Sequence, residues 1–133
     1  MSMKRVVLTV VPVSMVALCL VQARAFAADV LPAGDAARGK TLYQACEACH
    51  SIDDNDIGPR HRGVVGRRAG SLSDYAYSDA LKKSGVVWDE AALNRWLIDP
   101  SAMVPGTKMF FKIDNAQSRA DLIAFLKEQK AAK

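Results

Sequence analysis

Two cysteines and a histidine within five residues constrain this chain more than any other feature. The run is Cys46-Glu47-Ala48-Cys49-His50. On a helix, residues three apart lie on one face, so both sulfurs can point at one edge of a flat ligand. The histidine would then stand over the face of that ligand. This spacing is typical of a haem-attachment site, in which both thiols add across the haem vinyl groups as thioethers.

Three other kinds of site could use two cysteines at this spacing: a redox dithiol, half of a zinc site or a structural disulfide. A structural zinc ion needs four ligands, and outside this run the chain has only Cys19 and His61 as further cysteine or histidine ligands. A thioredoxin-like dithiol follows a strand and opens a helix. This run instead closes a predicted helix and enters a loop. The pattern therefore favours covalent haem, with His50 as a ligand of its iron.

Residues 1–27 have the features of a cleavable secretory signal. These features are a basic start, an apolar run and a small-x-small cleavage site, formed by Lys4 and Arg5, residues 6–21, and Ala25-Phe26-Ala27. The alternative is an uncleaved membrane anchor, but the run is short against the roughly 20 residues of a membrane span. We therefore expect export to the periplasm, with residues 28–133 as one mature domain and no stable membrane insertion after processing.

Processing also changes the charge of the protein. The whole chain has 18 Lys and Arg residues against 14 Asp and Glu residues. Loss of Lys4, Arg5 and Arg24 leaves 15 basic residues and a net charge of +1. This small excess gives no argument for nucleic-acid binding. A domain of this size buries a modest core, so a large apolar cofactor at its centre would help to stabilise it.

Apolar periodicity and turn residues predict an all-α domain with about four to five short helices. The predicted helices are residues 35–48, residues 78–84, the stretch from 89 that ends at Pro100, and a final helix from about 114. Asp114 and Gln117 have the spacing of a capping box at the start of the final helix. Residues 51–62 and 101–112 are predicted to be loops.

Gly39 lies four residues before Tyr43, on one face of the first predicted helix. A glycine inside a helix costs about 1 kcal/mol against alanine. It is therefore either a tolerated surface residue or a point at which another helix comes close. The sequence by itself leaves both possibilities open.

Taken together, these residues resemble the class I c-type cytochromes, especially the small soluble bacterial members close to mitochondrial cytochrome c. The likeness extends from Gly34 to Lys127. It has two specific parts, the haem-attachment run and a methionine loop, Pro105-Gly106-Thr107-Lys108-Met109. It also includes Gly58-Pro59, Gly66-Arg67, Tyr77, Trp88, Pro100 and the run from Asp121 to Leu126. The resemblance implies a cytochrome c fold around one covalent haem c.

The resemblance also implies a role for each site residue. Met109, rather than Met103, would be the distal ligand of the iron, opposite His50, and this pairing raises the reduction potential. The carbonyl of Pro59 would hold the His50 ring. The haem propionates would accept hydrogen bonds from Tyr77, Trp88 and Thr107, with Arg67 nearby. The first and last helices would cross where Gly39 and Tyr43 meet Leu122 and Phe125.

Three residues depart from the pattern of the mitochondrial members. Trp96 stands where they carry a tyrosine near the methionine sulfur, and Leu81 stands where they carry an internal asparagine. His61 occupies a position usually given to a leucine beside the haem. The lysine rim that docks acidic partners is also thin, although Lys108 remains.

The expected function is one-electron transfer in the periplasm, by a monomer that is not an enzyme. Its partners would be redox proteins: a quinol-oxidising cytochrome complex with a terminal oxidase or a photosynthetic reaction centre, or a periplasmic dehydrogenase. The alternative is a haem enzyme with peroxidase-like or gas-binding activity, which requires that Met109 does not bind the iron. No nucleic-acid partner is expected.

Overall fold

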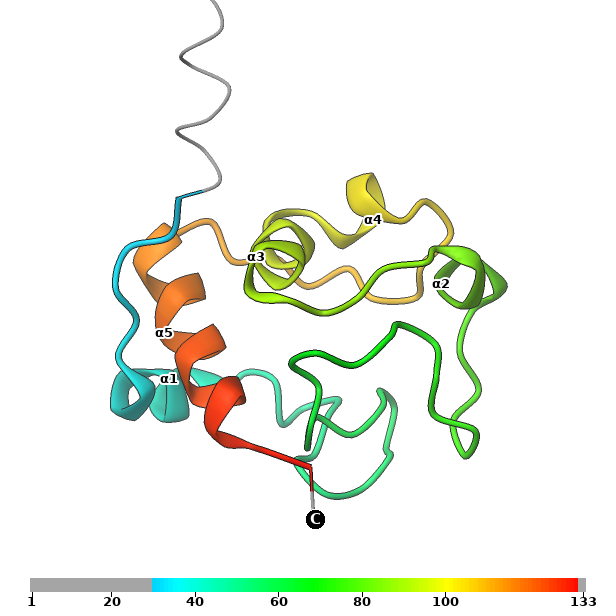
Figure 1. Cartoon of the computed structure of the whole chain (residues 1–133), viewed down its shortest axis with the longest axis horizontal. Helices are drawn as coiled ribbons and strands as arrows, with labels where there is room; N and C mark the ends of the chain where they lie inside the picture. The colour runs from blue at the N-terminus through cyan, green and yellow to red at the C-terminus, as the bar shows by residue number, and fades with distance from the viewer. Residues whose placement is uncertain (1–29, 132–133) are drawn as a thin grey trace, which may run out of the picture. The chain divides into compact units, whose positions relative to one another are not determined.

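The computed structural model describes residues 30–131, so the predicted signal segment lies outside the described residues. Within residues 30–131 the chain forms helices and no strand (Figure 1). The helices are α1 (Ala36–Tyr43), α2 (Asp79–Lys83), α3 (Glu90–Ile98), α4 (Pro100–Met103) and α5 (Ala116–Glu128). The predicted all-α fold is therefore confirmed. None of these helices is long and apolar enough to cross a bilayer.

Helices α1 and α5 cross with their backbones in close contact, and Gly39 makes this possible (Figure 1). A Cβ atom at position 39 would lie 2.0 Å from the carbonyl oxygen of Asp121 and 2.8 Å from Cβ of Phe125. The Tyr43 ring packs beside the crossing, 5.2 Å from the Phe125 ring. Leu122 belongs to the same buried cluster. The predicted crossing is confirmed, and Gly39 is not a tolerated surface residue.

A polar clasp centred on Asp121 holds the chain before α1 against α5. The Asp121 carboxylate accepts hydrogen bonds from the Arg38 side chain at 2.8 and 2.9 Å and from the backbone N–H of Asp35 at 2.8 Å. Gln117 donates to the same carboxylate at 2.9 Å and to the carbonyl of Ala33 at 2.7 Å. The clasp therefore links segments that are more than 80 residues apart in the sequence.

The predicted cap of α5 is wrong. Asn115, not Asp114, is the N-cap, and its side-chain oxygen accepts a hydrogen bond from the backbone N–H of Ser118 at 2.9 Å. With Asn115 as the cap, Ser118 is the third helical residue, so Gln117 no longer has the spacing of a capping box and its side-chain NH2 group instead donates to Asp121. Asparagine caps a helix as well as aspartate does, so local preference could not distinguish the two neighbours.

Two predicted boundaries also differ from the structure. Helix α1 ends at Tyr43, and turns continue to Cys49 where the prediction extended the helix to Ala48. Helix α4 begins at Pro100 and extends to Met103, although a loop was predicted from residue 101 onward. Proline suits the first turn of a helix, because its missing N–H would have no partner there. The carboxylate of Asp99 caps α4 by accepting from the N–H of Ala102 at 3.0 Å.

Helix α3 supplies the predicted apolar stripe, and its residues Leu93, Trp96 and Leu97 are buried. A polar contact that the sequence pattern did not reveal fixes this helix to α5. The buried Arg119 side chain donates to Oδ1 of Asn94 at 2.7 Å. It also donates to the carbonyl oxygens of residues 113 and 114, at 2.8 and 2.7 Å. Helices α3 and α5 are thereby held in fixed positions beside the cavity described next.

Candidate functional site

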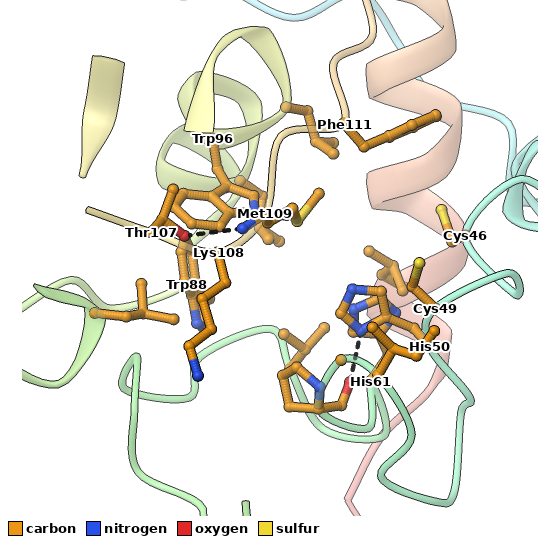
Figure 2. Close-up of a pocket in the computed structure, with 18 of the residues that line it drawn as sticks. Cys46, Cys49, His50, His61, Trp88, Trp96, Thr107, Lys108, Met109 and Phe111 are labelled. Carbon is orange, nitrogen blue, oxygen red and sulfur yellow. Dashed lines mark hydrogen bonds between the residues drawn. The ribbon is translucent and has the colours of Figure 1, made fainter. Parts of the chain in front are cut away.

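A cavity of about 690 Å³ lies beside the buried core and has a mainly apolar lining (Figure 2). Every residue predicted for the site lines this cavity: Cys46, Cys49, His50, Pro59, Arg67, Tyr77, Trp88, Thr107 and Met109. The three departures from the mitochondrial pattern, Leu81, His61 and Trp96, line it too. Met103 is not among the lining residues.

The two cysteines sit in the turn that follows α1. The backbone N–H groups of Cys49 and His50 both donate to the carbonyl of Cys46, at 3.0 and 2.9 Å. Both cysteines are free, Cys46 half-buried and Cys49 exposed. The local turn therefore brings both thiols and the imidazole to one side of the cavity, as Figure 2 shows.

The surroundings of these thiols argue against the alternative sites. Burial, helped by the negative charge of Glu47, raises the pKa of Cys46 to about 11. A reactive dithiol needs a depressed thiol pKa, so a redox role is disfavoured. Within residues 30–131 no group of three His, Cys, Asp or Glu side chains is placed to share a metal ion. A zinc site therefore has no support in the described part of the chain.

The His50 ring is held with one nitrogen free. Its Nδ1 lies 2.7 Å from the carbonyl oxygen of Pro59, the contact that the family resemblance implied. A carbonyl only accepts, so Nδ1 carries the proton and Nε2 keeps its lone pair. Burial lowers the pKa of His50, which favours the neutral, ligand-competent ring. The backbone at Gly58 lies so close that a Cβ atom there would be 2.2 Å from Cε1 of His50.

Met109 reaches the cavity from the other side, together with Trp96 and Thr107 (Figure 2). The indole N–H of Trp96 donates to the Met109 sulfur at 3.2 Å. The hydroxyl oxygen of Thr107 accepts from the Met109 backbone N–H at 3.4 Å. Gly106 has a φ of +90°, a conformation that favours glycine. The turn and the indole together orient the thioether.

The residues expected to bind the propionates lie in the cavity lining, and one of them, Arg67, also forms hydrogen bonds within the protein. The Arg67 guanidinium donates to the carbonyl oxygens of Arg62 and Arg60, at 3.1 and 2.8 Å. Tyr77, Trp88 and Thr107 are buried. Arg67 thus fixes the loop below the cavity, and two donated hydrogen bonds leave further N–H groups of its five for a ligand.

One contact at the site was not predicted. The His61 ring stacks on the His50 ring with centroids 4.1 Å apart and an interplanar angle of 19°. The Tyr43 hydroxyl lies 3.0 Å from Nδ1 of His61. The sequence shows that a histidine replaces the usual leucine, but no local pattern connects it to Tyr43 of helix α1.

The residues present fit a covalently attached haem. The cavity has an apolar lining, two free thiols and an imidazole on one side, and a thioether on the other side. A neutral imidazole with a free Nε2 lone pair and a thioether sulfur are both ligands that haem iron takes in cytochromes.

Known proteins resemble this chain along most of its length. Residues 36–130 match the family model described as Cytochrome c. The chain is 44% identical over 108 residues to cytochrome c2 of Rhodomicrobium vannielii, which covers 78% of this chain and 86% of that protein. It is 49% identical over 79 residues to cytochrome c-550 of Bradyrhizobium diazoefficiens, covering 57% and 58%.

A solved structure agrees with these sequence likenesses. Cytochrome cH from Methylobacterium extorquens matches with a TM-score of 0.69 and 50% sequence identity, covering 71% of this chain and 99% of that chain. Proteins named cytochrome c or cytochrome c2 are electron-transfer proteins with covalent haem c, not enzymes. The chain therefore belongs to the cytochrome c family, as a class I c-type cytochrome that carries covalently bound haem c and transfers electrons.

Proposed function

We propose that this electron carrier works in the periplasm and that His50 and Met109 are the two axial ligands of its haem iron. The observation that carries the proposal is the arrangement across one cavity. His50 presents a free Nε2 from one side, and Met109 presents a sulfur held by Trp96 from the other. In the same proposal Cys46 and Cys49 form the two thioether bonds.

Bound in this cavity, haem c supplies one-electron chemistry through an iron that alternates between ferric and ferrous states. The protein's own residues set how readily this happens. A soft thioether from Met109 favours the ferrous state and so raises the potential. The apolar lining keeps water away, and the buried hydroxyl and indole groups of Tyr77, Trp88 and Thr107 are the proposed donors to the propionates.

The mouth of the cavity carries apolar side chains that are open to solvent. Ile57 is 71% exposed, Phe110 70% and Phe111 45%, and all three line the cavity. Such a surface suits brief contact with another redox protein. The proposed partners are a quinol-oxidising cytochrome complex with a terminal oxidase or reaction centre, or a periplasmic dehydrogenase, met by a monomer of this chain.

Replacing Met109 by alanine tests the ligand assignment. We expect the Met109→Ala protein to lose the weak near-infrared sulfur-to-ferric-iron band and to bind carbon monoxide. Its potential should fall, within the span of about 0.8 V that axial ligands control. Absorption spectroscopy and voltammetry measure all three effects. Met103→Ala is the matched control and should show none of them, because Met103 does not line the cavity.

Two outcomes would contradict the proposal. If Met103→Ala lost the band while Met109→Ala kept it, the ligand assignment would be wrong. If the wild-type protein bound carbon monoxide readily at neutral pH, the sixth position of the iron would be open, and a gas-binding or peroxidase-like protein would be the better interpretation.

The periplasmic part of the proposal has its own test. The features of residues 1–27 predict cleavage after Ala27. Mass spectrometry of the protein isolated from the periplasm should give a polypeptide that begins at Ala28, with one haem added. A polypeptide that retains Met1 in the membrane fraction would show that the segment is an anchor.

A further inference from the structure

The stacked pair His50 and His61 is the starting point. The two rings are nearly parallel, with centroids 4.1 Å apart. His61 lines the same cavity, and its ring lies against the face of the proposed iron ligand.

Tyr43 determines where His61 carries its proton. Tyr43 is 2% exposed, so its hydroxyl hydrogen needs a partner within the protein. Among the contacts of residues 30–131, its partner is Nδ1 of His61 at 3.0 Å. Tyr43 therefore donates and Nδ1 accepts. An imidazole whose Nδ1 accepts a hydrogen bond carries its proton on Nε2.

These contacts restrict the His50 ring from several directions. The Pro59 carbonyl holds the Nδ1 edge at 2.7 Å, and the Gly58 backbone presses close to Cε1. One hydrogen bond still allows the ring to swing about it. A second ring against its face removes that freedom, and Tyr43 in turn keeps the second ring from turning over.

We propose that Tyr43 and His61 act as a pair of positioning residues that fix the ring plane of His50. This inference rests on the proposed function, because it takes His50 as an axial ligand of the iron. The pair joins helix α1 to the cavity, so the packing of the α1–α5 crossing also fixes the orientation of the imidazole.

Proton NMR of the oxidised protein tests the proposal, since hyperfine-shifted resonances of a ferric low-spin haem depend on the plane of its axial imidazole. We compare wild type, Tyr43→Phe, His61→Leu and the double variant. Both single variants should shift the pattern. Tyr43→Phe should cause no further shift in the His61→Leu background, because it acts only through His61.

Tyr75→Phe is the matched control. It also removes a tyrosine hydroxyl from the cavity lining, but this hydroxyl donates to the carbonyl of Ile57 and not to an imidazole. Its hyperfine pattern should equal that of wild type.

If His61→Leu yields no holoprotein, His61→Phe takes its place among the four proteins compared. Phenylalanine keeps a ring over His50 but cannot accept the Tyr43 hydrogen bond, so the pattern should likewise be insensitive to Tyr43→Phe.

Three results would overturn the proposal. One is an unchanged pattern in both single variants, even with a lower melting temperature, since the pair would then only fill space. The second is the same Tyr43→Phe shift in both backgrounds. The third is an equal shift from Tyr75→Phe. Failure of the proposed function looks different: wild type itself would lack the near-infrared band or the hyperfine resonances of a bound His50 ring.

Discussion

At the scale of single residues, Trp96 has the most direct influence on the proposed distal ligand. Its N–H donates to the Met109 sulfur at 3.2 Å. A donor on the sulfur withdraws electron density from it and weakens its donation to ferric iron more than to ferrous iron. Such contacts to a ligand tune the potential of a metal site. The tryptophan thus performs a task that the family resemblance associates with a tyrosine.

Trp96→Phe tests this role. The substitution keeps an aromatic ring in the core and removes the N–H donor, so the reduction potential should fall by a small fraction of the roughly 0.8 V span of axial ligation. Voltammetry measures the potential, and a retained near-infrared band shows that the sulfur is still bound. A potential that rises, with the band intact, would mean that the hydrogen bond has the opposite effect.

At the scale of helices, the crossing of α1 and α5 depends on Gly39. Gly39→Val should lower the free energy of unfolding by about 1–3 kcal/mol or more, because overpacking must push apart two backbones already in contact. Denaturant melts measure this. Ala37→Val is the matched control: Ala37 is an exposed residue of the same helix, and only the helix propensity changes, by up to about 0.7 kcal/mol.

The same melts can also contradict this explanation of Gly39. If Gly39→Val and Ala37→Val had equal midpoints and slopes, the crossing would have room for a side chain, and the close backbone contact could not be the reason for the glycine.

At the scale of the whole molecule, the clasp around Asp121 makes the free energy of unfolding depend on pH. Hydrogen bonds from Arg38 hold the pKa of Asp121 well below its usual range. A folded-state pKa below the unfolded value of about 3.9 stabilises the folded protein fully at higher pH. That contribution is lost as the pH falls through the unfolded pKa towards the folded one, because protonation then favours the unfolded chain.

Asp121→Asn should therefore be less stable than wild type at pH 7, and the difference should shrink as the pH is lowered below about 4. Urea melts at several pH values measure it. Asp54→Asn is the control, since within residues 30–131 the Asp54 carboxylate forms no ion pair. A stability difference for Asp121→Asn that stayed constant down to pH 3 would show that the charge of Asp121 is unimportant.

Local sequence predicted the helices well where one pattern dominated. The apolar stripe of α3 is an example, because it depends on residues three or four apart, whereas local sequence left the role of Gly39 open and the crossing was implied only by the family resemblance. Prediction failed at helix ends. Asn115 and Asp114 are equally good caps by local preference, and the structure uses Asn115. Pro100 could end one helix or begin the next, and the structure uses it to begin α4.

The sequence by itself predicted covalently bound haem c, and the comparisons support that cofactor. Cys46, Cys49 and His50 lie within five residues of one another, so their spacing can be recognised without knowledge of the fold. Only the tertiary structure decided which side chains meet across the cavity. Tyr43 and His61 are 18 positions apart, Trp96 and Met109 are 13 apart, and Asn94 and Arg119 are 25 apart. Such partners depend on how α1, α3 and α5 pack together, and packing of this range leaves no trace in local periodicity.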